Sequence, residues 1–247
     1  LSNVGNAAFN DPFYGWIDNE QIYFADRNTG IRRIGVNERN LALSTSDAKY
    51  DYFVQNNRLE YYGNPWQYGA MNACFAKADG LWYWGKTYGG GGIFRFAESD
   101  ISPVDISRGT NPPYATIFPD EFVKSFVIDA TNQILYAVIR DKGLYAVPLT
   151  DITANDATKT NTKAESKYLV ASFKSDSEGS VGEYVDVCQM VLDNSDGSVY
   201  FGLRAEEGSS ETSGVKRWNP TTKKLETIVS GVNVYGIALN NELSNLF

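Results

Sequence analysis

The sequence of 247 residues contains no histidine. Histidine supplies the general base of Ser/His/Asp and Cys/His catalytic groups and is a common zinc ligand, so sites of both kinds are excluded. Chemistry that uses carboxylates alone, as in glycosidases or calcium-dependent lactonases, stays open. We therefore favour a non-enzymatic role and predict no cofactor, with a calcium-dependent lactonase-like hydrolase as an alternative.

Basic residues are also scarce, with 22 Lys and Arg against 30 Asp and Glu and a net charge of −8. Nucleic-acid binding depends mainly on clustered basic side chains that meet phosphates, so the charge excludes nucleic acid as a partner. An anionic membrane surface is disfavoured for the same reason. No apolar run reaches about 18 residues, so no membrane-spanning helix is predicted.

Cysteine is nearly absent: Cys74 and Cys188 are the only two. They could form one disulfide or stay free on buried strands, and the sequence favours neither. The chain starts at Leu1, as expected after removal of a signal peptide, which predicts a secreted protein.

Aromatic residues, in contrast, make up 14% of the chain, and long helical runs are missing, so an all-β protein with almost no helix is expected. A unit of hydrophobic strands and polar turns recurs along the sequence. In its clearest copy, residues 125–129, 133–139 and 144–148 alternate with turn residues. First strands of such units are predicted at residues 13–18, 49–54, 73–77, 125–129, 187–192 and 233–239.

Each unit alone exposes an apolar face that only a neighbouring unit can cover. We therefore predict a β-propeller of about six blades, each with four antiparallel strands, as a single domain over residues 1–247. Its sixth blade would be completed by the N-terminal segment or by chain beyond Phe247. Two polar segments, residues 151–167 and 206–213, are predicted to be long exposed loops.

The second half of the chain resembles the yellow/major royal jelly protein family. The resemblance lies in the hydrophobic strands and turns at residues 133–136, 143–147, 196–203, 215–218 and 226–229. It implies a secreted six-bladed propeller. It further implies that a small molecule, such as a biogenic amine, binds in the central cavity, or that the protein has a structural or storage role.

Three local motifs invite a functional interpretation. Residues 193–197 (DNSDG) have the oxygen-rich pattern of half a calcium loop, but no bidentate Glu follows, which favours a hairpin turn. The glycines at 89–92 precede no Lys-Ser/Thr, so a loop is favoured over a phosphate site. Trp66, Trp82 and Trp84 could stack on sugar rings, as in a propeller lectin, although packing between blades explains Trp82 and Trp84 better.

If a central cavity binds a ligand, polar residues near the starts of the first strands would line it. These candidates are Tyr14, Asp51, Asn72, Lys124, Asp186 and Asn233. An acidic residue such as Asp186 or Asp51 could pair with an amine, and Tyr14 could offer a ring face. Each could equally serve only to satisfy hydrogen bonds in a loop. The predicted partner is thus a small molecule or, alternatively, a glycan.

Overall fold

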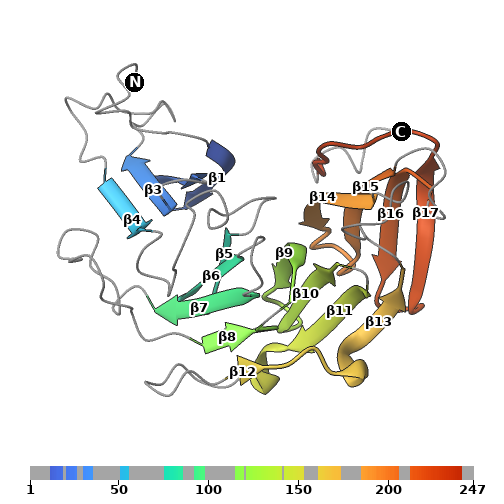
Figure 1. Ribbon diagram of the computed structural model, residues 1–247, viewed down its shortest axis with the longest axis horizontal. Coiled ribbons are helices and arrows are strands. Elements are labelled where there is room, and N and C mark those ends of the chain that lie inside the picture. Colours follow the sequence, from blue (N-terminus) through green and yellow to red (C-terminus); the bar gives the residue numbers. More distant parts are fainter. Residues whose placement is uncertain are drawn as a thin grey trace. The chain divides into compact units, whose positions relative to one another are not determined.

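Figure 1 shows the computed structural model of the protein, in which the described elements are almost all β-strands. The described residues are 12–18, 21–26, 30–35, 51–55, 75–85, 92–97, 115–119, 121–140, 142–152, 161–173, 185–205 and 212–240. Within these ranges there is no α-helix, and two short 3-10 helices cover Leu149–Asp151 and Ser166–Tyr168. The composition therefore predicted the all-β class correctly.

The strands form four antiparallel sheets. The first sheet runs in chain order through β1 (Pro12–Asp18), β2 (Gln21–Asp26), β3 (Gly30–Gly35) and β4 (Asp51–Gln55). The second contains β5 (Phe75–Ala78), β6 (Leu81–Gly85), β7 (Ile93–Ala97), β8 (Ala115–Ile117) and β12 (Asn161–Thr162).

The third and fourth sheets come from the second half of the chain. The third contains β9 (Val123–Asp129), β10 (Ile134–Ile139), β11 (Gly143–Pro148) and β13 (Leu169–Ser172). The fourth contains β14 (Val185–Leu192), β15 (Val199–Ala205), β16 (Gly214–Asn219) and β17 (Lys224–Ser230). In each sheet the first three strands are consecutive antiparallel neighbours, as the repeated unit predicts.

The chain divides into two compact units. The first comprises Leu1–Phe122 and Thr153–Asn161, and the second comprises Val123–Ile152 and Thr162–Phe247. The third and fourth sheets both belong to the second unit. That the whole chain acts as one domain stays a prediction.

Three expectations from the sequence are wrong. Residues 49–54 do not begin a sheet, because β4 is the fourth strand of the first sheet and pairs with β3. Residues 233–239 follow β17 without forming a strand. The segment 151–167 is not simply an exposed loop, because Thr162 in β12 is buried.

A core cluster fills the space between the third and fourth sheets. Its fully or nearly fully buried members are Tyr136, Val138, Leu144, Phe173, Val187, Met190, Val199, Phe201, Leu203 and Trp218. Phe173 and Phe201 stack with ring centroids 5.5 Å apart. Burial of such side chains contributes most of the stability of a sheet pair, at about 1.5–3 kcal/mol for each large apolar residue.

The first strands of these two sheets also meet directly. The buried Ser125 hydroxyl on β9 accepts a hydrogen bond from the backbone N–H of Met190 on β14, at 3.1 Å. The strand pairing of β14 with β15 is irregular between Val187 and Met190. The hydrogen bond to Ser125 therefore gives the Met190 N–H an acceptor outside the regular pairing. First strands of consecutive sheets are thus neighbours in the second unit, as in adjacent blades.

Three hairpin turns of the second unit, between β9 and β10, β14 and β15, and β16 and β17, share one sequence signature. In each, an Asp or Asn side chain accepts a hydrogen bond from the backbone N–H of a residue two or three positions later. The pairs are Asp129 with Asn132 at 2.8 Å, Asp193 with Ser195 at 2.9 Å, and Asn219 with Thr221 at 2.9 Å. This local bond lets Asp and Asn nucleate turns.

A second part of the signature lies four positions after each Asp or Asn. Gln133, Gly197 and Lys223 all have a positive φ there, of 58°, 74° and 54°. Glycine adopts this left-handed conformation at little cost, whereas Gln and Lys are strained by it. The three turns therefore have one geometry, although only one has glycine at the left-handed position.

Glycine also marks the start of the third strand in consecutive sheets. A Cβ atom on Gly92, Gly143 or Gly214 would lie 2.1, 2.1 or 1.8 Å from a backbone carbonyl oxygen. In each case that oxygen belongs to the fourth strand of the same sheet, at Ile117, Ala171 or Val229. Only glycine allows the two strands to approach this closely.

Candidate functional site

The structure places the predicted ligand residues at different points of the sheets. Tyr14 lies on β1, Lys124 on β9 and Asp186 on β14, each in the first strand of a sheet as predicted. Asp51 begins β4, which is a fourth strand, so its expected position near a first-strand start is wrong. Asn72 lies outside the described residues. Asn233 lies in the segment after β17.

Two of these residues, Asp186 and Asn233, come to the same end of the fourth sheet. Asp186 is opposite Arg204 in the pairing of β14 with β15. Beyond β17 the chain turns back toward this end, where the backbone N–H of Gly231 donates to the Ser213 carbonyl oxygen at 2.8 Å. The N–H of Val234 donates to the carbonyl oxygen of Leu203, next to Arg204, at 3.5 Å.

Side chains make further contacts at this end. The Arg204 guanidinium lies over the Tyr235 ring, with 5.2 Å between its carbon and the ring centroid. Nevertheless 72% of Tyr235 is exposed, the largest fraction among the exposed large hydrophobic residues of the described chain. The Ser213 hydroxyl donates to Asn233 Oδ1 at 2.7 Å. We call Asp186, Arg204, Ser213, Asn233 and Tyr235 the strand-start cluster.

Sequence reasoning missed Arg204, Ser213 and Tyr235. The segment that contains Tyr235 was expected to be a buried first strand, which would have hidden the ring. One sequence signal could have shown that this segment is not a strand. Gly231 and Gly236 flank Tyr235, and glycine is unfavourable within a strand. Arg204 carries no local signal, because its contact with Tyr235 depends on the chain turning back after β17.

Lys124, in contrast, is 8% exposed. It immediately precedes Ser125, which bonds the neighbouring first strand. The Lys124 side chain is therefore largely covered by the protein itself. A ligand-contacting role for Lys124 remains a prediction.

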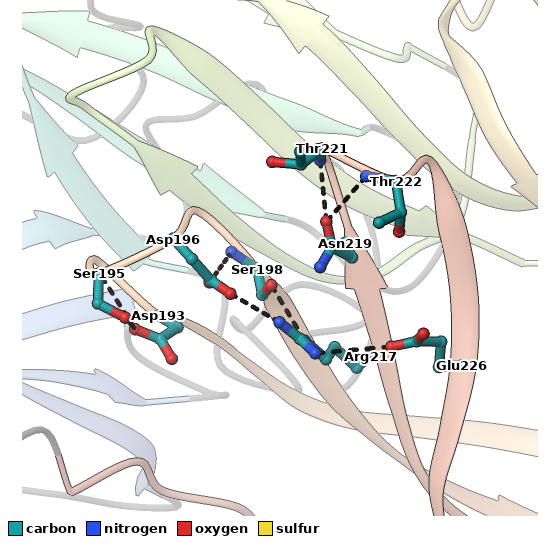
Figure 2. A network of polar contacts seen from close by, with 9 residues as sticks. All are labelled: Asp193, Ser195, Asp196, Ser198, Arg217, Asn219, Thr221, Thr222 and Glu226. Carbon is teal, nitrogen blue, oxygen red and sulfur yellow. Dashed lines mark hydrogen bonds and ion pairs between the residues drawn. The ribbon is translucent and has the colours of Figure 1, made fainter. Parts of the chain in front are cut away.

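The DNSDG segment forms the turn between β14 and β15, which the sequence favoured over a calcium loop (Figure 2). The Asp193 carboxylate accepts both the N–H and the hydroxyl of Ser195, at 2.9 and 2.5 Å. The Asp196 carboxylate accepts the N–H of Ser198 at 2.8 Å. Both carboxylates are thus hydrogen-bonded within the turn itself, and no group of three potential metal ligands occurs among the described residues.

Arg217 on β16 connects this turn to the sheet (Figure 2). Its Nη2 lies 2.6 Å from Asp196 Oδ2, its Nε donates to Ser198 Oγ at 3.1 Å, and its Nη1 lies 3.6 Å from Glu226 Oε2. Burial alone would raise the pKa of the Asp196 carboxyl, but the hydrogen bonds from Ser198 and Arg217 outweigh it and hold that pKa below its ordinary value. This network stabilises the turn.

The tryptophan cluster also has a structural explanation. Trp82 on β6 is completely buried, and the Lys77 ammonium lies 4.9 Å from its ring centroid. Its ring is therefore not available to stack on a sugar, which confirms the packing interpretation for Trp82. The Trp84 side chain and Trp66, like Cys74 and the Cys188 side chain, lie outside what the structure describes.

No protein-family model matches the chain, and no curated protein matches it. Solved structures do resemble it. A protein assigned as a 6-phosphogluconolactonase from Bacteroides uniformis has a TM-score of 0.53 and 10% identity over 95% of this chain and 62% of its own. The periplasmic gluconolactonase of Pseudomonas aeruginosa has a TM-score of 0.49 and 9% identity over 90% of this chain and 57% of its own.

An extracellular domain of a one-component system from Bacteroides thetaiotaomicron gives a TM-score of 0.48 and 13% identity, over 92% of this chain and 24% of its own. This chain thus spans less than two thirds of the length of each of these proteins. Among the described residues, no helix is long and apolar enough to cross a membrane.

The comparison with the B. uniformis protein agrees with a fold of four antiparallel sheets. The resemblance to the yellow/major royal jelly proteins gains no support from these matches. The chain is an all-β protein with a β-propeller fold.

Proposed function

We propose that this propeller binds a small organic molecule at the strand-start cluster without transforming it. The observation that carries the proposal is the Tyr235 ring, which is 72% exposed yet is held in place by Arg204 and by the backbone bonds of residues 231–234. A large aromatic side chain with such exposure is a common anchor for ligands.

The site also has hydrogen-bonding groups around the ring. Asn233 and Ser213 are linked to each other at 2.7 Å, and Asn233 is exposed. Arg204 adds a positive charge, and Asp186 is its partner in the pairing of β14 with β15. A ring face beside an amide, a hydroxyl and a charge has the composition of a binding site for a polar ring-shaped molecule.

An amine is the ligand that the sequence predicts, with Asp186 as its partner and an aromatic ring for a cation–π contact. A glycan is the second candidate, and one observation favours it. Because Arg204 already places a positive charge on one face of Tyr235, a second cation on the other face would be repelled, whereas a neutral sugar ring would not.

We further propose that the protein acts outside the cell, as predicted from the sequence. A structural or storage role is the alternative in which the strand-start cluster binds nothing.

Isothermal titration calorimetry with aromatic amines and with methyl glycosides tests the proposal. We expect one of these classes to bind, and Tyr235→Ala to weaken its affinity about tenfold. The control is Val232→Ala, which changes another exposed side chain of the same segment, 49% exposed, and should leave affinity unchanged. Affinity that is insensitive to Tyr235→Ala, or no binding by either class, would contradict the proposal.

A further inference from the structure

We propose that two copies of this chain associate through β17, by antiparallel pairing of the outer edges of their fourth sheets. The association is a property beyond ligand binding and does not use the strand-start cluster. It follows from the position, the exposure and the sequence of this one strand (Figure 1).

β17 is the last strand of the fourth sheet, and among the described strands it pairs only with β16. An edge strand of this kind presents backbone N–H and C=O groups with which another strand can form hydrogen bonds. The second sheet shows such an addition within this chain, because β12 extends it beyond its fourth strand, β8.

Exposure distinguishes β17 from the fourth strands of the second and third sheets. All three residues of β8 are buried, and the first three residues of β13 are half-buried. In contrast, the last four residues of β17, Thr227–Ser230, are all exposed. The outer edge of the fourth sheet is therefore the one of these three that is open to a further strand.

The exposed half of β17 lacks the residues that usually protect an edge. Ile228 is 50% exposed and Val229 is 44% exposed, and both are β-branched residues that favour strands. Proteins commonly place charged residues or proline on such edges, but neither occurs from Thr227 to Asn241. The register irregularity at Ile228 has counterparts in the pairing of β3 with β4 and of β11 with β13, so it is a repeated feature of the fold.

A second copy of this chain is the partner that fits, because β17 is complementary to itself. With a two-fold axis between positions 228 and 229, Ile228 lies opposite the partner's Val229, and Thr227 lies opposite the partner's Ser230. Cross-strand pairs of β-branched residues are favourable, and no like charges face each other over residues 227–230. Because each copy has a net charge of −8, an uncharged contact is also the kind that adds no repulsion between them.

The paired stretch is short, so the association should be weak. Interfaces that bury less than about 1,200 Å² belong to weak, reversible complexes, and we expect a Kd of about 10–100 μM. Two-fold pairing occupies the outer edge of both fourth sheets, so it produces a dimer and no larger assembly.

Sedimentation velocity on the whole chain tests the proposal. We expect a monomer at about 1 μM and mostly dimer at about 300 μM, on either side of the expected Kd. Hydrogen exchange at the two concentrations tests the position of the contact. Backbone amides of residues 227–230 should exchange more slowly at the higher concentration, because strand pairing protects them.

Two edge variants test the register of the pairing. Ile228→Lys and Val229→Glu each place a charge opposite an apolar side chain of the partner and should raise the Kd at least about tenfold. Mixed in equal amounts, the two variants should associate again, because their opposite charges face each other in the proposed register. Both positions are exposed, so thermal unfolding of each variant should be unchanged.

The matched control is Leu239→Lys, which adds the same charge at a residue that is 36% exposed and lies outside β17. It should leave the Kd unchanged. Tyr235→Ala should also leave the dimer intact, because Tyr235 belongs to the strand-start cluster.

A monomer at every concentration would overturn the proposal. A dimer that forms equally well with both edge variants, or that is lost in Leu239→Lys, would overturn it too, because the contact would then lie elsewhere. None of these results bears on the proposed function, which depends on ligand titrations of the protein and of Tyr235→Ala. Failure of one claim is therefore distinguishable from failure of the other.

Discussion

At the scale of single residues, the turns of the second unit depend on a few side chains with defined tasks. Asp129, Asp193 and Asn219 each accept a backbone N–H of their own turn. Such turns were predictable as turns, because Asp, Asn and Gly cluster between hydrophobic strands. The shared positive φ four positions later was not predictable at Gln133 and Lys223, because the pairing of the flanking strands imposes it.

Lys223 illustrates the cost of that geometry. Its φ of 54° is unfavourable for a residue with a Cβ atom. Because Lys223 is exposed, replacing its side chain should remove few packing contacts. We expect Lys223→Gly to raise the free energy of unfolding by about 0.5–1 kcal/mol, measured by urea denaturation. The neighbouring control, Thr222→Gly, has no positive φ to relieve and should lower it instead.

Asp196 predicts a dependence on pH. Its pKa is lower in the folded protein than its ordinary value of 3.8, so its charge contributes stability above that value and loses the contribution as pH falls through the folded pKa. The carboxylate is 41% exposed, which limits the effect to less than about 1 kcal/mol.

Asp196→Asn should therefore be less stable than the unsubstituted protein at about pH 7, and the difference should shrink at a pH well below 3.8, as the pH falls through the lowered pKa of Asp196. Urea denaturation at both pH values measures it. A difference that is the same at both would show that the carboxylate charge is not what stabilises this turn.

At the scale of elements, the local sequence pattern located most strands, but it did not show whether a strand is the first or the fourth in its sheet. Residues 125–148 were correctly divided into three strands, because alternation and turn residues are local. Residues 49–54 have the same hydrophobic pattern, yet β4 is a fourth strand. First and fourth strands differ in their neighbours, which local sequence does not encode.

The glycine at the start of each third strand is the repeat feature that best defines a sheet. A Cβ atom at Gly214 would lie 1.8 Å from the carbonyl oxygen of Val229, and φ there is 151°. Gly214→Ala should lower the free energy of unfolding by more than about 3 kcal/mol, by separating β16 from β17. Gly236→Ala is the control, because nothing lies within 4 Å of that position, and should change stability by less than about 1 kcal/mol.

Contact between adjacent sheets gives another prediction. Ser125 is completely buried and accepts the N–H of Met190 from the next sheet. Ser125→Ala leaves that buried donor without its acceptor, which should cost about 1–3 kcal/mol in thermal or urea unfolding. The control Ser195→Ala removes an exposed serine hydroxyl and should lower the free energy of unfolding by less than about 1 kcal/mol. Equal losses of stability in the two variants would contradict a stabilising role for the bond between Ser125 and Met190.

At the scale of the whole molecule, the repeat predicted the propeller fold, while the sequence located only part of the site. Asp186 and Asn233 were predicted from their positions near strand starts and do lie at one end of the fourth sheet. Arg204 and Tyr235 were not predicted as site residues, because their contact joins distant parts of the sequence. Sites of this kind are created by chain reversals, whose direction is set by tertiary packing.

Amide NMR of the isotope-labelled chain, titrated with the tightest-binding methyl glycoside, tests most directly whether the strand-start cluster is the binding site. Shifts confined to the backbone around residues 203–205, 213–214 and 231–236, and abolished by Tyr235→Ala, are the predicted result. Shifts at other positions of the described sheets, with the Tyr235 region unchanged, would contradict it.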